Sequence, residues 1–160
     1  MSMIDAPALE CVDLESGRSR AIVGAAERAP LLLRGETVHR QLRPDLDTDY
    51  VAQIERMIGE GARLAQLVEK DEVRAIALWR VFETTYCGRR LEIEDLVSDE
   101  TRRSGGHGAA MLHWLEKKAK ALDCPTLTLI SATNRGRAHR FYFREGYEIT
   151  AFHFVRQTRD

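Results

Sequence analysis

A glycine-rich run with the sequence Arg-Ser-Gly-Gly-His-Gly occupies residues 103–108, between an apolar, acidic segment and an amphipathic one. Gly106 and Gly108 fall where the chain should leave a strand and begin a helix. The first amides of a helix have no acceptor within the helix, and the helix dipole makes that end positive. Because glycine also lets a ligand approach the main chain closely, the run predicts a phosphate or pyrophosphate site. The alternative is an ordinary glycine-rich surface turn.

Carboxylates precede the glycine run in the segment 91–97, which reads Leu-Glu-Ile-Glu-Asp-Leu-Val. Alternation along a strand would place Glu92 and Glu94 on one face and Asp95 on the other. A carboxylate held near a reacting amine can remove its proton. It can equally recognise a cationic substrate or pair with an arginine such as Arg80, and the residues themselves leave these roles open.

The elements that must position these groups follow from the hydrophobic pattern. We expect a first strand from Thr37 to Leu42, ended by Pro44. A helix follows, whose apolar face includes Val51 and Ile58. Three strand-like segments joined by turn sequences come next, and they indicate an antiparallel meander. These segments span residues 64–69, 73–86 and 91–97.

The second half of the chain alternates between helices and strands. A helix over residues 108–122 buries a leucine-rich face, and a strand begins near Leu127. A second helix ends at Glu145, with Gly146 as its left-handed cap. Alternating apolar residues then predict a final strand over 147–156. Helices and strands that alternate after an antiparallel meander indicate a mixed α/β sheet.

The composition excludes several classes of function. The 160 residues carry 24 basic and 25 acidic side chains, for a net charge of -1, so nothing favours nucleic acid or an acidic membrane as a partner. No apolar run approaches the length of a membrane span, and the N-terminus lacks the pattern of a signal peptide. Because Cys11, Cys87 and Cys124 form no metal-binding pattern, we expect reduced thiols in a cytoplasmic protein.

Two motifs resemble the signatures of one enzyme superfamily. Leu96 and Val97, followed by residues 103–109, resemble the acetyl-CoA signature of the GNAT superfamily of N-acetyltransferases, which is Arg/Gln-x-x-Gly-x-Gly/Ala on the turn after a strand. Further along, the chain matches the superfamily pattern Asn-x-x-x-Ala-x-x-Phe-Tyr-x-x-x-Gly-Phe/Tyr. The matching residues are Asn134, Ala138, Phe141, Tyr142, Gly146 and Tyr147. The resemblance covers residues 37–156.

The resemblance implies an α/β (α+β) fold in which helices flank a mixed, mostly antiparallel sheet whose central strands splay apart. It places the acetyltransferase domain at residues 37–160, after an N-terminal extension of uncertain structure at residues 1–36. The pantetheine arm of acetyl-CoA would lie between the splayed strands and pair with Leu96 and Val97 like an added strand.

The same resemblance implies which residues contact acetyl-CoA. The backbone amides of residues 103–108 would bind the pyrophosphate, Arg102 and Arg103 would add positive charge, and Asn134 would hold the cofactor arm, cap a helix, or do both. His107 occupies a variable place in the pattern, and we expect its ring to face solvent. The full expected set is Leu96, Val97, Arg102, Arg103, Ser104, Gly105, Gly106, His107, Gly108, Ala109, Asn134, Ala138 and Phe141.

Acetyl transfer to an amine needs a base for the ammonium proton, donors for the oxyanion and an acid for the departing thiolate. By its place in the superfamily pattern Tyr142 is the expected acid, with packing against the sheet as its alternative role. Glu94 is the expected base, and Glu92 comes next. No metal is expected to take part.

The sequence therefore predicts an acetyl-CoA-dependent N-acetyltransferase that transfers acetyl directly to a primary amine. The acceptor stays open between a small-molecule amine and a protein amine, and neither nucleic acid nor a membrane is an expected partner. Two alternatives remain, a non-catalytic module that binds acyl-CoA and a transferase of a longer acyl group. The apolar segment 147–155 also allows a homodimer edge.

Overall fold

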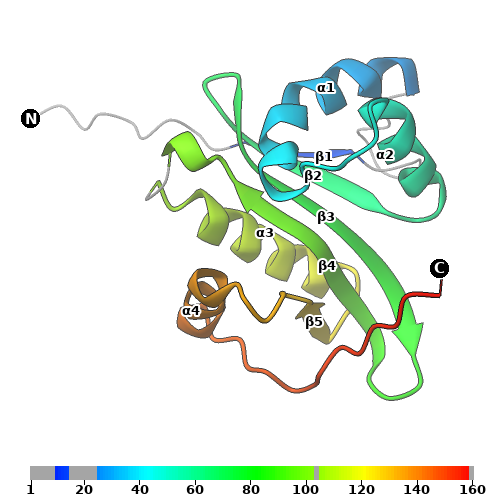
Figure 1. Cartoon of the computed structure of the whole chain (residues 1–160), viewed down its shortest axis with the longest axis vertical. Coiled ribbons are helices and arrows are strands. Elements are labelled where there is room, and N and C mark those ends of the chain that lie inside the picture. The colour runs from blue at the N-terminus through cyan, green and yellow to red at the C-terminus, as the bar shows by residue number, and fades with distance from the viewer. Residues whose placement is uncertain (1–9, 15–24, 103–104, 159–160) are drawn as a thin grey trace, which may run out of the picture. The chain divides into compact units, whose positions relative to one another are not determined.

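The computed structural model describes residues 10–14, 25–102 and 105–158 (Figure 1). The chain divides into two compact units, one reaching Thr128 and one beginning at Leu129. In chain order the elements are β1 (Glu10–Leu14), α1 (Ala25–Leu42), α2 (Tyr50–Gly59), β2 (Arg63–Glu69), β3 (Glu72–Thr84), β4 (Gly88–Ser98), the 3-10 turn η1 (Glu100–Arg102), α3 (His107–Ala121), β5 (Thr126–Leu129) and α4 (Gly136–Arg144). Helix α4 belongs to the second unit.

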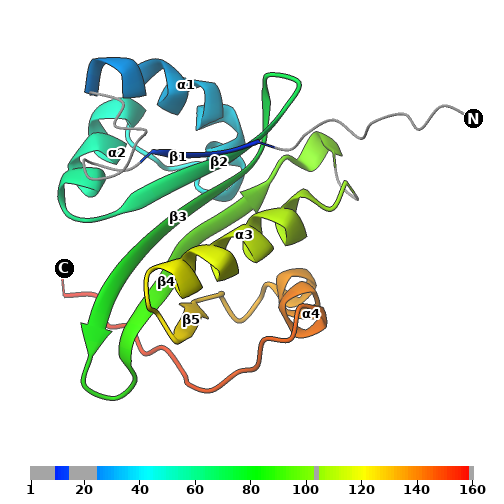
Figure 2. The same cartoon turned by 180° about the vertical axis from the view of Figure 1, so that it is seen from behind.

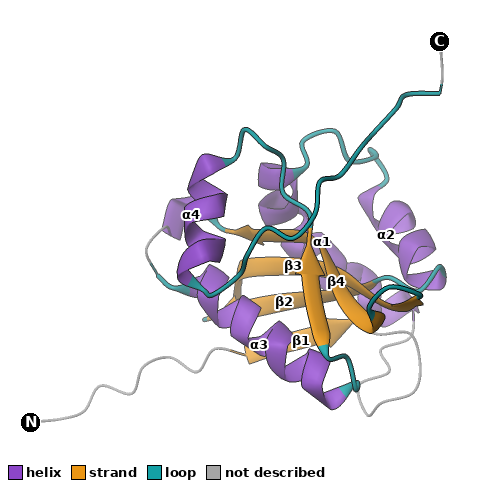
Figure 3. Cartoon of the chain, turned by 90° about the horizontal axis from the view of Figure 1, so that it is seen from below, coloured by secondary structure: helices purple, strands orange, loops and turns teal. Residues whose placement is uncertain are grey.

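The first unit has the mixed α/β architecture that the sequence predicts. Its sheet has the strand order β1-β2-β3-β4-β5, and β1 to β4 pair antiparallel in succession. Helices α1 and α2 cover one face of these strands, and α3 covers the other (Figure 2). Figure 3 shows the strands as a layer between helices. The splaying of the central strands stays a prediction.

Apolar residues fill both faces of the central strand β3. Ile76 and Leu78 join Leu32 of α1 in the larger core, and all three side chains are at most 2 % exposed. On the other face Trp79 meets Trp114 of α3 edge to face, with ring centroids 6.3 Å apart. Burial on both sides anchors β3, and β3 in turn positions β4, the strand that leads to the glycine run.

The predicted meander is confirmed in β2, β3 and β4. Lys70 (φ 51°) and Asp71 (φ 64°) form the turn between β2 and β3. Two successive residues with positive φ are typical of a tight hairpin turn. None of the described helices is long and apolar enough to span a membrane.

The predicted strand from Thr37 to Leu42 is wrong, because these residues form the end of the 18-residue helix α1. Thr37 and Val38 are β-branched and locally favour a strand. The helix instead buries Val38 and His39 against the rest of the unit, and tertiary packing outweighs the local preference. Helix α1 also runs through the expected domain boundary after residue 36, and that division stays a prediction. Strand β1, in a part of the chain that the pattern left unassigned, pairs with β2.

The predicted final strand over 147–156 is also wrong, since residues 147–158 have no regular secondary structure. A strand needs a neighbour that exchanges backbone hydrogen bonds with it, and in the described part of the chain this segment has no such neighbour.

The predicted left-handed cap at the end of α4 is confirmed. Gly146 has a φ of 86°, and the amide of Tyr147 donates to the carbonyl of Tyr142 at 2.9 Å.

Candidate active site

The glycine run leads into the start of α3, as predicted. Gly106 is the N-cap residue of this helix and has the left-handed conformation, with a φ of 73°, and none of the described side chains caps the helix. The amides of His107, Gly108 and Ala109 therefore have no acceptor within the helix. A Cβ added at Gly106 would meet no heavy atom of the described residues within 4 Å.

His107 is buried, so the expectation that its ring faces solvent is wrong. Its side chain is 8 % exposed, and its Nε2 lies 3.9 Å from Oε2 of Glu69, at the end of β2. The ring also fills the space beside Gly105, where an added Cβ would collide with it. Glycine at position 105 is therefore required by the packing of a histidine, and the histidine joins the helix start to the sheet.

Arg102 belongs to the same turn, because its carbonyl accepts a hydrogen bond from the amide of Gly105 at 3.3 Å. The Arg102 side chain lines a polar cavity of about 350 Å³, together with Arg34 and other charged residues. The lining carries three arginines and three acidic residues, so its formal charges balance. Arg103 and Ser104, also expected at the cofactor, lie outside the described residues.

Strand β4 carries Leu96 and Val97 into this turn. On one side they pair with β3. On the other side the neighbour is β5, which has 4 residues against the 11 of β4 and cannot cover its whole length. The hydroxyl of Thr128 in β5 donates to Oε2 of Glu92 at 3.3 Å, so β5 lies beside the middle of β4. The main-chain edge at Leu96 and Val97 therefore extends past β5.

A β-bulge at Glu94 changes the predicted arrangement of the carboxylates. Leu78 pairs with Asp95 and Trp79 pairs with Ile93, so Glu94 has no partner on β3. The extra residue interrupts the alternation, and the expectation that Glu94 and Asp95 lie on opposite faces is wrong. Both carboxylates contact residues on the face that α1 and α2 cover.

Glu94 and Glu92 are each paired with an arginine. Nε of Arg80 donates to Oε1 of Glu94 at 2.5 Å, and Nη1 of Arg80 donates to the carbonyl of Glu60, just after α2, at 2.7 Å. Glu92 lies 2.7 Å from Nη2 of Arg90. The arginine pairing that the sequence left as an alternative is thus present. It also fixes the position of the Glu94 carboxylate near the end of α2.

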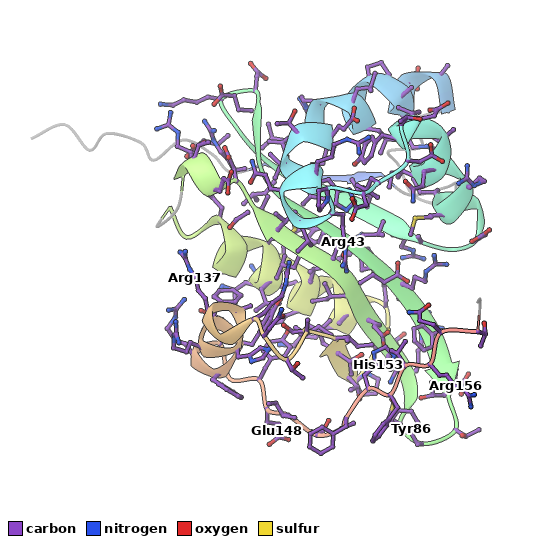
Figure 4. All side chains as sticks on the ribbon, viewed as in Figure 1. Arg43, Tyr86, Arg137, Glu148, His153 and Arg156 are labelled. Carbon is purple, nitrogen blue, oxygen red and sulfur yellow. The ribbon has the colours of Figure 1, made fainter. Side chains whose placement is uncertain are left out.

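A buried chain of hydrogen bonds joins α1, α2 and β4 on the same face, and sequence reasoning missed it. Nε2 of His39 lies 3.1 Å from Oδ2 of Asp95, and its Nδ1 lies 2.9 Å from the hydroxyl of Tyr50. Arg43, just after α1, donates from Nε to Oδ1 of Asp95 at 2.7 Å; Figure 4 labels Arg43 at this position. His39 is fully buried.

The charge states in this chain follow from its surroundings. Burial opposes ionisation of Asp95, but hydrogen bonds from His39 and Arg43 and the charge of Arg43 outweigh it, so the pKa of the Asp95 carboxyl lies below its usual range. Burial raises the pKa of Tyr50 well above its ordinary value, and the hydroxyl keeps its proton. Tyr50 can then donate to His39, and His39 can donate to Asp95. His39 and Arg43 are separated by one helical turn, so a helix over these residues would have predicted that they lie on the same face. The sequence pattern predicted a strand there instead, and the pair was missed.

The second unit holds the remaining predicted residues. Ala138, Phe141 and Tyr142 are partly buried on α4, and the ring of Tyr142 contacts those of Phe141 and Tyr147, with centroids 5.3 and 5.9 Å away. Burial raises the pKa of the Tyr142 hydroxyl, and the charge of Arg135 opposes this only in part.

Asn134 is exposed and precedes the helix by one residue more than expected. Arg135 occupies the N-cap position of α4 and caps it with no side-chain hydrogen bond, so the capping role of Asn134 is wrong. The amide of Arg135 donates to the carbonyl of Ala132, and this turn delays the helix start. Cofactor contact by Asn134 stays a prediction. No group of three His, Cys, Asp or Glu side chains in the described ranges could hold a metal ion.

Comparison with known proteins agrees with this architecture. The sequence model of the acetyltransferase (GNAT) family matches residues 34–147. An uncharacterized N-acetyltransferase of Bacillus subtilis, YhdJ, is 33% identical over 119 residues, covering 71% of this chain and 82% of YhdJ. The aminoalkylphosphonate N-acetyltransferase of Salmonella typhimurium is 35% identical over 65 residues, 41% of this chain and 42% of that protein.

Solved structures share the fold at low sequence identity. The aminoglycoside N-acetyltransferase AAC(6')-Iy in complex with CoA has a TM-score of 0.78 and 10% identity, covering 99% of this chain and 100% of that one. The ribosomal-protein-alanine N-acetyltransferase of Brucella melitensis has a TM-score of 0.73 and 11% identity, covering 94% and 99%. The fold and these relatives define an N-acetyltransferase. The chain belongs to the acetyltransferase (GNAT) family.

Proposed function

We propose that this chain is a cytoplasmic, acetyl-CoA-dependent enzyme that transfers an acetyl group directly to a primary amine, with neither a metal nor an acyl-enzyme. The observation that carries the proposal is the uncapped start of α3 behind Gly106, at the end of β4. Its free amides and the positive end of the helix suit the pyrophosphate of CoA. Structural relatives solved with CoA or a CoA conjugate support this choice of donor.

The main chain supplies most of the proposed contacts with the donor. The amides at the start of α3 bind the pyrophosphate, and Arg102 adds positive charge. The edge of β4 at Leu96 and Val97, which extends past β5, takes the pantetheine arm like an added strand. An amide of this edge also polarises the thioester carbonyl. Further contacts are proposed for Arg103, Ser104, Gly105, Asn134, Ala138 and Phe141.

Acetyl-CoA supplies an activated thioester, and side chains of this protein handle the protons. Tyr142 is the proposed acid for the departing thiolate; because burial raises the pKa of Tyr142, the hydroxyl holds its proton until that moment. Glu94 is the proposed base for the acceptor amine, acting directly or through water. Arg80 holds the Glu94 carboxylate in place. Glu92, nearer to β5, is the second candidate for the base.

Calorimetry with acetyl-CoA, followed by a thiol-release assay over a panel of amines, tests the proposal. The panel includes aminoglycosides and aminoalkylphosphonates, for which relatives are named, together with amino acids and peptides. We expect saturable binding and acceptor-dependent thiol release. Absence of binding at high-micromolar acetyl-CoA contradicts the proposed donor. Binding without release on any amine favours a non-catalytic module, and faster release from longer acyl-CoA donors favours a different acyl group.

Changing Gly106 to alanine should weaken acetyl-CoA binding by about tenfold or more, because the added Cβ enters the space over the amides of the turn. Gly61→Ala is a matched control. Gly61 also has a positive φ (92°) and open surroundings, but it lies after α2. Both variants should lose about 1 kcal/mol of stability, and Gly106→Ala alone should lose affinity in a calorimetric titration. Equal affinities would exclude the turn as the binding site.

Changing Glu94 to glutamine should lower turnover by about a hundredfold, because the amide cannot accept the ammonium proton. Glu92→Gln is the control, since each substitution removes the negative charge of a β4 glutamate that pairs with an arginine. Steady-state rates of thiol release measure both effects, and Glu92→Gln should stay within about threefold of the unaltered enzyme. If Glu92→Gln is slower than Glu94→Gln, then Glu92 is the base and Glu94 is not. Normal rates in both would indicate that a desolvating pocket, and neither carboxylate, deprotonates the amine.

A further inference from the structure

A buried arginine, Arg74, lies near the start of β3, at the end of the sheet where β4 leads into the glycine run. Its side chain is 7 % exposed and pairs with the carboxylates of Glu69, Glu72 and Asp99. Figure 1 and Figure 2 show the β2–β3 turn, η1 and the start of α3 at this same end of the sheet. Because three carboxylates already surround the guanidinium, its charge is matched within the protein and is not available to a phosphate.

Asp99 is the partner of Arg74 where the connection from β4 to α3 begins. Nη1 of Arg74 donates to Oδ2 of Asp99 at 3.5 Å. The amide and the hydroxyl of Thr101 donate to the same carboxylate, at 3.0 and 2.9 Å. Gln41 of α1 also donates to it, at 3.4 Å, and accepts from the amide of Glu100 at 2.9 Å. Asp99 therefore joins η1 to both β3 and α1.

The Asp99 carboxylate carries a negative charge in this network. Burial opposes its ionisation, but hydrogen bonds from Thr101 and Gln41 and the charge of Arg74 outweigh burial, so the pKa of Asp99 lies below its usual range. The link between Arg74 and η1 is therefore an ion pair between a buried cation and a buried anion.

Glu69 is the partner of Arg74 where the connection ends. Its Oε2 accepts from Nε of Arg74 at 3.3 Å and lies 3.9 Å from Nε2 of His107, the first residue of α3. Gly106, the N-cap residue, directly precedes His107. One guanidinium thus reaches both ends of the connection, each through a single carboxylate. Supporting contacts of this kind keep the groups of a binding site in their productive geometry.

We propose that Arg74 is a positioning residue for acetyl-CoA, which keeps η1 and the start of α3 in the geometry where the amides of α3 bind the pyrophosphate. The inference rests on the proposed function, since it takes the turn at Gly106 as the pyrophosphate site. Arg74 acts through Asp99 and Glu69 and does not contact the cofactor. Without Arg74, both ends of the connection lose their link to β3, and the surrounding carboxylates lose the cation that matches them.

Changing Arg74 to methionine tests this role, because it keeps a long side chain and removes the charge. The dissociation constant for acetyl-CoA should rise about tenfold or more, since the amides no longer converge on the pyrophosphate. S-acetylpantetheine has the same thioester and arm but no phosphate, so its dissociation constant should change less than about threefold. Calorimetric titration measures both ligands, and circular dichroism checks folding. An equal loss for both ligands would mean that the whole site is distorted, and it overturns the proposal.

Arg28→Met is the matched control. Arg28 is similarly buried, with a side chain that is 10 % exposed, and it pairs with Glu55 of α2 through two hydrogen bonds. The variant should lose stability but bind acetyl-CoA within about twofold of the unaltered chain. Comparable losses of affinity in Arg28→Met and Arg74→Met would mean that any broken buried ion pair weakens binding, which contradicts a specific role for Arg74.

Glu69→Gln gives a test that does not depend on the folding of Arg74→Met. The substitution keeps the shape of the side chain and removes a negative charge beside His107. Charge alone predicts tighter binding of the anionic cofactor. Loss of the link from Arg74 to the start of α3 instead predicts binding about threefold weaker. Unchanged or tighter binding of acetyl-CoA by Glu69→Gln overturns the proposal.

The unaltered chain separates this inference from the proposed function. If it binds no acetyl-CoA at high-micromolar concentration, the proposed function fails, and the role of Arg74 fails with it. If the unaltered chain binds acetyl-CoA and a folded Arg74→Met variant binds it as tightly, only the role of Arg74 is overturned.

Discussion

Changing Tyr142 to phenylalanine should lower kcat by about a hundredfold or more and leave the KM for acetyl-CoA nearly unchanged. The variant keeps the ring that packs against Phe141 and Tyr147, and it loses only the hydroxyl. Because burial raises the pKa of Tyr142, the hydroxyl remains protonated over the working pH range. The rate of the unaltered enzyme should therefore show no loss from ionisation of Tyr142 below about pH 10. Steady-state thiol release as a function of pH measures both effects.

Tyr147→Phe provides the control for this variant. Tyr147 lies in the same cluster of rings, 5.9 Å from Tyr142, and the superfamily pattern accepts phenylalanine or tyrosine at this position. Its kcat should stay within about threefold of the unaltered enzyme. If Tyr142→Phe also turns over at the normal rate, the thiolate takes its proton from another donor, and Tyr142 serves only to pack the helix.

The parts of the site that could be predicted are those set by neighbours in the chain. The left-handed conformations of Gly106 and Gly146 follow from local backbone geometry, and each glycine marks a helix end as expected. Strands β2 to β4 were predictable because alternating apolar runs are separated by turn residues. In both cases the signal lies within a few residues of the feature it predicts.

The parts that could not be predicted depend on contacts between distant segments. His39 and Asp95 are 56 residues apart in the chain and meet only because α1 folds over the sheet. The bulge at Glu94 is defined by pairing with β3, so the residues of β4 alone do not reveal it. The burial of His107 likewise depends on the space that Gly105 leaves and on Glu69, across the sheet.

Two segments with strand-like sequences show that contacts with the rest of the fold, rather than local strand preference, decide the secondary structure. Residues 37–42 are helical because α1 buries its apolar side chains against the sheet. Residues 148–156 have a clearer alternation, yet they have no regular secondary structure. β-Propensity measures how well a side chain fits a pleated, half-buried surface, and it cannot create that surface.

The largest expected effect on stability belongs to Asp95. Changing Asp95 to alanine should lower the free energy of unfolding by about 3 kcal/mol, because the fully buried His39 would lose its acceptor and Arg43 its carboxylate. Glu36→Ala is the control, since it removes the partner of Arg40 in a more exposed ion pair on the same helix. That variant should lose no more than about 0.5 kcal/mol. Urea unfolding at neutral pH measures both.

The pH dependence of this network has a definite sign. Because the pKa of Asp95 is lower in the folded chain than its ordinary value of about 3.9, the ionised carboxylate stabilises the fold above that pH. The contribution is lost as the pH falls through the lower, folded-state pKa. The difference in unfolding free energy between the unaltered chain and Asp95→Asn should therefore be fully present at about pH 5 and shrink below about pH 4. A difference that persists unchanged to pH 3 would mean that shape and hydrogen bonding at Asp95, rather than its charge, hold His39 and Arg43 in place.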